Sequence, residues 1–145
     1  MEISLQELSA ALEKTDILQG YVDTREGRIL MIEEDVAASL DKAAQREEAH
    51  MESVLAIEED WQRYVPLPNL YDMEIRSIMQ GFAEKAPAET RLALEGALCA
   101  SAARRRFFHT VRSLSLEKVW REYLSMRLLV LAREWCEEND VAYCE

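Results

Sequence analysis

The sequence contains few glycines and histidines, and it lacks the motifs that usually mark a catalytic or phosphate-binding site. Its 145 residues include 4 glycines and 2 histidines. They form no glycine-rich phosphate loop, no Gly-x-Ser-x-Gly turn and no His-Glu-x-x-His pair. No apolar run approaches the roughly 20 residues that span a bilayer. We therefore expect no catalytic residues, no cofactor, no metal site and no contact with a membrane.

Cysteine is also scarce, with three residues that lie far apart and form no Cys-x-x-Cys pair. This number and spacing favour reduced thiols over a disulfide framework or a zinc site. Cys99 follows a helical apolar run and is expected in the core, whereas Cys144 is expected at the surface. The first residues, Met1 to Ser4, lack the cationic and apolar regions of a signal peptide. These features predict a cytoplasmic protein.

Positive charge is in deficit overall, and its distribution along the chain is uneven. The net charge is −11, which disfavours general affinity for nucleic acids or anionic membranes. Residues 1–65 hold 6 basic and 16 acidic residues, whereas residues 100–127 hold 7 basic and 2 acidic residues. The chain is therefore polarised, with net charges of −10 and +5 in these two segments.

The first half of the chain predicts a helix and a β-hairpin. Ser4 and Glu7 form a capping box before a helix over residues 5–14. Residues 20–23 and 28–32 read as strands joined by a turn at Gly27, and the second strand has the apolar composition of a strand buried on both faces. Residues 33–44 and 45–60 are expected to be helical. Residues 63–68 contain two prolines and are expected as an edge strand beside the hairpin.

The second half predicts helices in close succession. Asn69 is a candidate N-cap, Ile75, Ile78, Met79 and Phe82 have helical spacing, and Pro87 suits the start of the following helix. Further helices are expected over residues 102–113 and 116–138, with a short strand at residues 141–144. The expected fold is a single α+β domain over residues 1–145. It is predominantly helical, with an N-terminal helix and β-hairpin followed by a bundle of about five helices.

The helix expected over residues 102–113 has two distinct faces. Its apolar stripe, at about 100° per residue, comprises Ala100, Ala103, Phe107, Val111 and Leu114. The remaining surface carries cations and an aromatic ring: Arg104, Arg105, Arg106, Phe108, His109 and Arg112. Clustered guanidinium groups bind carboxylates or phosphates through paired hydrogen bonds, and an aromatic ring can stack on a base. These six residues are the predicted contact surface.

Three interpretations of this surface remain open. The arginines pair with the acidic first half of the chain or stay solvated, which is the common fate of surface charges. Alternatively, they bind an anion or nucleic acid, or they contact an acidic protein partner. An enzyme is disfavoured, because a nucleophile, base and orienting group would have to be assembled with only two histidines. His50 lies in a charged helical stretch and is expected to be solvated, and the arginines around His109 disfavour its protonated form.

Several segments, taken in order, resemble a bacterial uncharacterised protein family, the one numbered 0158. The similarity covers nearly the whole chain: the opening helix, the turn at Gly27 with Ile29–Ile32, Tyr64–Pro68, Ile78-Met79-x-x-Phe82, Arg105-Arg106-Phe107, Trp120 and Ala132–Asn139. The resemblance implies a small cytosolic bacterial protein and assigns no activity.

The sequence departs from this family just before the paired arginines. Members usually carry Gly-Arg-Gly-Ala-Phe where this chain has Ala100, Ser101, Ala102, Ala103 and Arg104. Because glycine accommodates tight backbone bends, the substitution predicts that such a bend is missing here. The family tends to have an aromatic residue at the position of Arg104 and a lysine at that of Phe108. In this chain a cation and an aromatic ring have therefore exchanged places one helical turn apart.

The sequence thus leaves the function open between three hypotheses. The first is a non-enzymatic protein that contacts a protein partner, or a second copy of itself, through the arginine-rich helix. The second is an anion or nucleic-acid binding module that uses Arg105, Arg106, His109 and Arg112. The third is an enzyme of unknown type.

Overall fold

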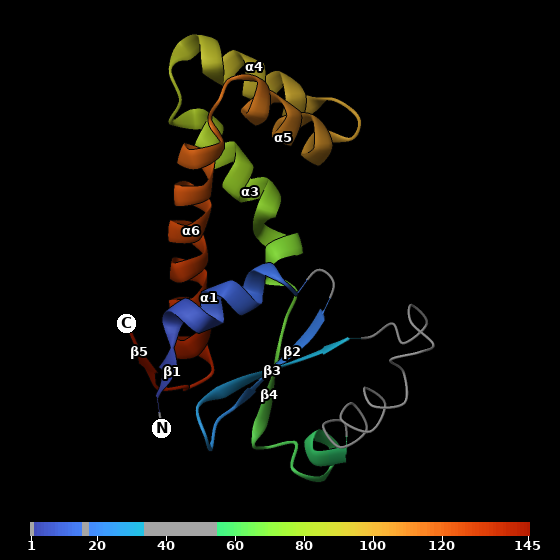
Figure 1. Ribbon diagram of the computed structural model, residues 1–145, viewed down its shortest axis with the longest axis vertical. Helices are drawn as coiled ribbons and strands as arrows, with labels where there is room; N and C mark the ends of the chain where they lie inside the picture. The colour runs from blue at the N-terminus through green and yellow to red at the C-terminus, as the bar shows by residue number, and fades with distance from the viewer. Residues whose placement is uncertain (1, 16–17, 34–54) are drawn as a thin grey trace.

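The computed structural model describes residues 2–15, 18–33 and 55–145. Their elements run in the order β1 (Ile3–Ser4), α1 (Leu5–Glu13), β2 (Leu18–Asp23), β3 (Arg28–Glu33), β4 (Tyr64–Leu67), α3 (Leu70–Glu84), α4 (Ala88–Cys99), α5 (Ala103–Ser113), α6 (Glu117–Glu138) and β5 (Tyr143–Cys144) (Figure 1). The fold is α+β and predominantly helical, with an N-terminal helix and hairpin followed by a helical bundle, as predicted. Of the helix expected over residues 33–44, Glu33 instead ends β3, and the rest lies outside the described residues. Most of the helix expected over residues 45–60 also lies outside them, and residues 55–59 are helical.

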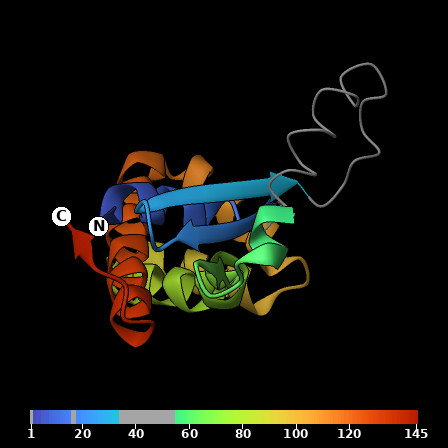
Figure 2. The ribbon, with the colours of Figure 1, turned by 90° about the horizontal axis from the view of Figure 1, so that it is seen from below.

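The N-terminal segment connects the two ends of the chain. The Ser4 side chain accepts a hydrogen bond from the Glu7 amide at 3.4 Å, which is the N-cap contact expected for α1. Strand β1, which the sequence analysis did not predict, pairs in parallel with β5, and the two termini lie together at one edge of the molecule (Figures 1 and 2). Leu5, Leu8 and Leu12 are buried on the inner face of α1.

A three-stranded antiparallel sheet has the order β3-β2-β4. The predicted turn between β2 and β3 places Gly27 at φ 68°, in the left-handed region that glycine adopts freely. Strand β4 lies at the sheet edge and tolerates Pro66 opposite Tyr21, because an edge strand can lack one amide donor. The prediction that the second hairpin strand is buried on both faces was wrong, since β3 is the other edge and Ile29, Leu30 and Met31 are only partly buried.

A buried ion pair holds the hairpin turn against β4. The Asp23 carboxylate is fully buried and accepts two hydrogen bonds from the Arg63 guanidinium, each 2.7 Å long. It also accepts the Arg25 amide at 3.0 Å and the Glu26 amide at 3.3 Å. These donors, with Arg63 first among them, hold the pKa of Asp23 well below its usual range. The pairing joins positions 40 residues apart, and the sequence pattern did not indicate it.

The long helix α6 runs along the long axis of the molecule, and α1 and α3 pack against it (Figure 1). Its buried side carries the residues predicted for it: Trp120, Leu124, Leu128, Leu131 and Trp135. Helix α3 begins at the predicted cap, where the Asn69 side chain accepts the Asp72 amide at 3.0 Å. Within the described residues, no helix is both long and apolar enough to cross a membrane.

Helices α4 and α5 lie side by side at the end of the molecule opposite the three-stranded sheet (Figure 1). Helix α4 buries Leu94, Ala97 and Leu98. Cys99 was predicted in the core but is exposed, because it follows Leu98 by about 100° around the helix and is the last residue of α4. Cys144 is exposed, as predicted, whereas Cys136 is buried.

Candidate binding surface on helix α5

Helix α5 begins at a backbone bend and is anchored by two buried side chains. Phe107 and Val111, one turn apart, are the buried residues of the helix. Ala102 occupies the N-cap position with φ 54° and ψ 45°, in the left-handed region. The prediction that a bend is missing here was therefore wrong, because Ala102, which stands where the family usually has glycine, itself adopts a left-handed conformation. Leu114, which the apolar stripe also predicted as buried, is exposed at the C-terminal end of the helix.

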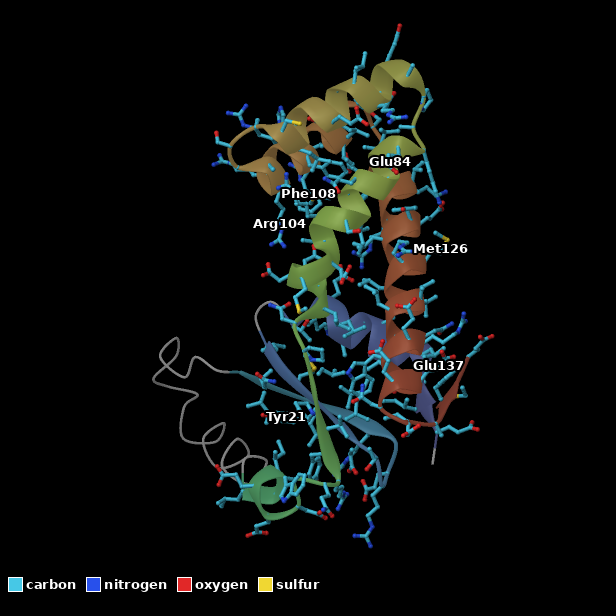
Figure 3. The ribbon with its side chains drawn as sticks, turned by 180° about the vertical axis from the view of Figure 1, so that it is seen from behind. Tyr21, Glu84, Arg104, Phe108, Met126 and Glu137 are labelled. Carbon is cyan, nitrogen blue, oxygen red and sulfur yellow. The ribbon has the colours of Figure 1, made fainter. Side chains whose placement is uncertain are left out.

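Two of the predicted contact residues turn toward the body of the molecule. Arg104 extends from α5 toward α3, where its Nη2 lies 3.0 Å from Asp72 Oδ1 and its guanidinium lies 5.6 Å from the centre of the Tyr71 ring (Figure 3). Phe108 is half-buried, with its ring tilted edge-on to Trp120 at 5.9 Å and to Phe107 at 6.0 Å. Its role is thus partly structural.

The other four residues, Arg105, Arg106, His109 and Arg112, form the outward side of α5, and all are exposed. Across residues 2–15, 18–33 and 55–145, none of these four side chains forms a salt bridge. We call these four residues the cationic face. Arg105, His109 and Arg112 are spaced i, i+4 and i+7, so they span about 10 Å of the helix axis.

Helix polarity makes the position of these arginines unfavourable. Arg104, Arg105 and Arg106 lie in the first turn of α5, which contains no acidic residue and no side-chain cap. The N-terminal end of a helix carries a partial positive charge, so a cation there destabilises the helix. Arg104 offsets this through Asp72, whereas Arg105 and Arg106 have no such partner in the described residues.

Two open hollows adjoin the cationic face. The first, of about 700 Å³, is lined by Ala102, Ala103, Arg104, Arg105, Phe108, His109 and Arg112. The second, of about 560 Å³, lies between α4 and α5. It is lined by Ala93, Gly96 and Ala97 of α4 and by Ala102, Arg105, Arg106, His109 and Thr110. Arg105 and His109 line both hollows. The structure thus brings all six predicted contact residues to the walls of one hollow or the other.

The α4 side of the second hollow was not predicted from the sequence. Ala93, Gly96 and Ala97 have the i, i+3, i+4 spacing of one helix face. That spacing was visible in the sequence, but nothing there indicated that this face lies beside α5.

The acidic first half of the chain does pair with the basic segment, but through an arginine that is not one of the six predicted contact residues. Arg121 of α6 donates two hydrogen bonds to the Glu13 carboxylate of α1, one of them 2.8 Å long, and this contact raises the pKa of Arg121. Arg104 pairs with α3 and not with the first half. Internal pairing therefore accounts for Arg104 and Arg121 but not for the cationic face.

The chemistry available at the cationic face is the binding of anionic groups. Three guanidinium groups and an imidazole supply several N–H donors, and guanidinium forks match carboxylate or phosphate oxygens. Within the described parts of the chain, no three His, Cys, Asp or Glu side chains gather in a way that could hold a metal ion. His109 lies on the cationic face, whereas His50 lies outside the described residues.

Comparison with known proteins identifies a family but no relative of assigned activity. A family model described as "Uncharacterised protein family (UPF0158)" matches residues 1–145. No curated protein and no solved structure matches the chain significantly.

Proposed function

The chain belongs to the uncharacterised protein family UPF0158, and we propose that it is a small, non-enzymatic protein of the bacterial cytosol that binds a protein partner through the cationic face of α5. The observation that carries this proposal is the pair Arg105 and Arg106. These residues are exposed in the first turn of α5, where they oppose the helix dipole, and no salt bridge within the described residues compensates them. Local departures from favourable chemistry of this kind tend to gather at functional sites.

The rigidity of α5 supports the same proposal. Phe107 is completely buried and lies 5.1 Å from Trp120 of α6, ring centre to ring centre, and 6.2 Å from Phe82 of α3. The buried side of the helix is thus fixed to two other helices, while the opposite side stays exposed. A surface held in place before binding loses little conformational entropy when a partner associates.

Binding of a nucleic acid or another polyanion is the alternative function. The observation in its favour is the row Arg105, His109 and Arg112, which aligns donors along about 10 Å of helix. The net charge of −11 opposes it, because a long polyanion would be repelled by the rest of the molecule. Retention on heparin at low ionic strength, followed by elution with salt, tests this alternative directly.

The proposal is tested by capture of partners from a bacterial lysate with immobilised protein. The double charge reversal Arg105→Glu/Arg106→Glu should abolish capture of a specific protein that the wild type retains. The matched control is Lys14→Glu/Arg25→Glu, which makes the same change in net charge at two exposed residues near the C-terminal end of α1 and in the hairpin turn. The control should retain the partner.

Two results would overturn the proposal. The first is equal loss of the partner in the control and in the α5 variant, which would indicate a general effect of net charge. The second is retention of the partner by a correctly folded α5 variant, since the cationic face would then be dispensable.

A further inference from the structure

The second hollow, between α4 and α5, has walls of two different kinds, and we call it the α4–α5 groove. Arg105, Arg106 and His109 line its α5 wall, and Ala93, Gly96 and Ala97 line its α4 wall. One wall is therefore cationic and the other consists of small apolar residues. The walls come from neighbouring helices, so their spacing is set by the packing of α4 on α5.

Gly96 is not explained by the packing of the protein. It lies inside α4, where glycine lowers helix stability relative to alanine. A Cβ atom added at Gly96 would meet no heavy atom within 4 Å, so no neighbouring group requires its absence. Its backbone is not in the left-handed region either, because Gly27 is the glycine with positive φ in the described residues. The consequence of glycine here is that no side chain projects from the middle of the α4 wall.

The apolar character of the α4 side extends beyond the groove itself. Leu92 lies one turn before Gly96 on the same helix and is 72% exposed. A leucine this exposed, next to a wall of small residues, offers an apolar surface for a ligand to cover.

We propose that the α4–α5 groove binds a short segment of a partner protein that combines acidic and apolar side chains. In this arrangement, carboxylates contact Arg105, Arg106 and His109, while an apolar side chain lies over Gly96 and covers Leu92. The inference rests on the proposed function and specifies where on the surface the partner lies and what it is made of.

Charge and surface chemistry both favour a peptide over a nucleic acid. The cationic wall covers little more than one helical turn, which suits a few carboxylates and is short for a polyphosphate chain. A peptide can supply an aliphatic side chain that packs on the exposed Leu92, whereas a sugar–phosphate backbone has no such group. The net charge of −11 adds repulsion that grows with the length of an anionic ligand.

The experiment is a titration of the full ¹⁵N-labelled protein with two short peptides of equal charge at low ionic strength, followed by NMR. One peptide alternates glutamate with leucine, and the other replaces each leucine with alanine. A thymidine oligonucleotide of equal charge is the third probe. We expect the Glu/Leu peptide to shift the amide resonances of Ala93, Gly96 and His109, and to bind about tenfold more tightly than the Glu/Ala peptide, since burial of one leucine supplies an effect of that order.

Two variants at one position test the groove without altering charge. Gly96→Leu places a large side chain on the α4 wall of the groove, whereas the matched control Gly96→Ala adds one methyl group. Gly96→Leu should weaken binding of the Glu/Leu peptide by about tenfold or more. Gly96→Ala should keep the wild-type affinity within about threefold. Thermal unfolding of both variants checks that they are folded.

Several outcomes would overturn the inference. They are the absence of peptide-induced shifts at Gly96, equal affinity of the Gly96→Leu and Gly96→Ala variants, and tighter binding of the oligonucleotide than of the Glu/Leu peptide. If the Arg105→Glu/Arg106→Glu variant loses its lysate partner while Gly96→Leu retains it, the groove assignment fails and the proposed function stands. If neither variant loses the partner, both fail.

Discussion

At the scale of single residues, Asp23 is the most heavily bonded side chain described in the protein. Its fully buried carboxylate accepts hydrogen bonds from Arg63 and from the amides of Arg25 and Glu26, and these contacts join the hairpin turn to the start of β4. Removing one partner of a buried ion pair is strongly destabilising, because the charge that remains is buried and uncompensated. We therefore expect the packing of the hairpin turn against β4 to depend on this carboxylate.

Replacing Asp23 with asparagine should destabilise the protein and change how its stability depends on pH. The substitution removes the nearest counter-ion of the mostly buried Arg63 and leaves it only the Glu26 carboxylate at 3.6 Å, so we expect a loss of about 3 kcal/mol in the free energy of unfolding at pH 7. Because the pKa of Asp23 is lowered in the folded state, its contribution is complete above the unfolded-state pKa of about 4 and declines as the pH falls below it.

Urea unfolding at pH 7 and at pH 3 measures this effect. The difference in stability between the wild type and Asp23→Asn should be smaller at pH 3. A constant difference at both values would show that the carboxylate charge is not what stabilises the turn.

Ala102 has a backbone conformation that lowers the stability of the fold. An L-residue in the left-handed region is disfavoured by about 1 kcal/mol, whereas glycine adopts it freely. Because Ala102 is exposed, its methyl group contributes little packing. The variant Ala102→Gly should therefore raise the free energy of unfolding by about 1 kcal/mol, as measured in urea. A lower stability would mean that the bend before α5 is not strained.

At the scale of elements, the features that depend on local sequence were predictable. Asn69 caps α3, and Trp120, Leu124, Leu128, Leu131 and Trp135 line the buried side of α6, because caps and helical periodicity are properties of neighbouring residues. Pairings between segments far apart in the sequence were not predictable. The β1–β5 pair, the Asp23–Arg63 contact and the α4 wall of the groove each depend on which segments become neighbours after folding.

The same distinction applies to the candidate binding surface. The six predicted residues do line the two hollows, because their clustering on one helix is a local property. What the sequence did not reveal is that Arg104 is paired with Asp72 and Phe108 is half-buried, while the other four remain exposed. That division depends on where α3 and α6 lie relative to α5.

Gly96 lies inside helix α4, where glycine lowers the stability of the helix relative to alanine. With nothing within 4 Å of an added Cβ atom, Gly96→Ala should raise the free energy of unfolding by about 0.5–1 kcal/mol. The measurement is denaturant unfolding at neutral pH. A destabilised variant would show that the fold requires the glycine, and it would contradict a role of Gly96 in keeping the groove open.

At the scale of the whole molecule, the cationic face is a local exception on an acidic protein. Helix α5 lies at the end opposite the three-stranded sheet, and the chain as a whole carries −11 charges (Figure 1). Charges on an exposed surface interact over about 8 Å at physiological ionic strength and over less at high salt. An acidic partner would therefore be attracted at this end and repelled elsewhere, which favours one orientation.

Binding through the cationic face should be sensitive to salt. The affinity for the Glu/Leu peptide should fall by about tenfold between low ionic strength and about 0.5 M salt, because screening weakens contacts between exposed charges. Fluorescence anisotropy with a labelled peptide measures this change. If affinity is constant over the salt range, apolar contacts alone hold the peptide.

The central claim is that Arg105 and Arg106 serve binding and not the stability of the fold, and thermal unfolding of Arg105→Glu/Arg106→Glu tests it most directly. Glutamate in the first turn of α5 complements the helix dipole, so the account predicts a melting temperature equal to that of the wild type or up to about 3 °C higher. A fall of more than about 5 °C would mean that the two arginines hold the molecule together through internal contacts, and it would contradict the account.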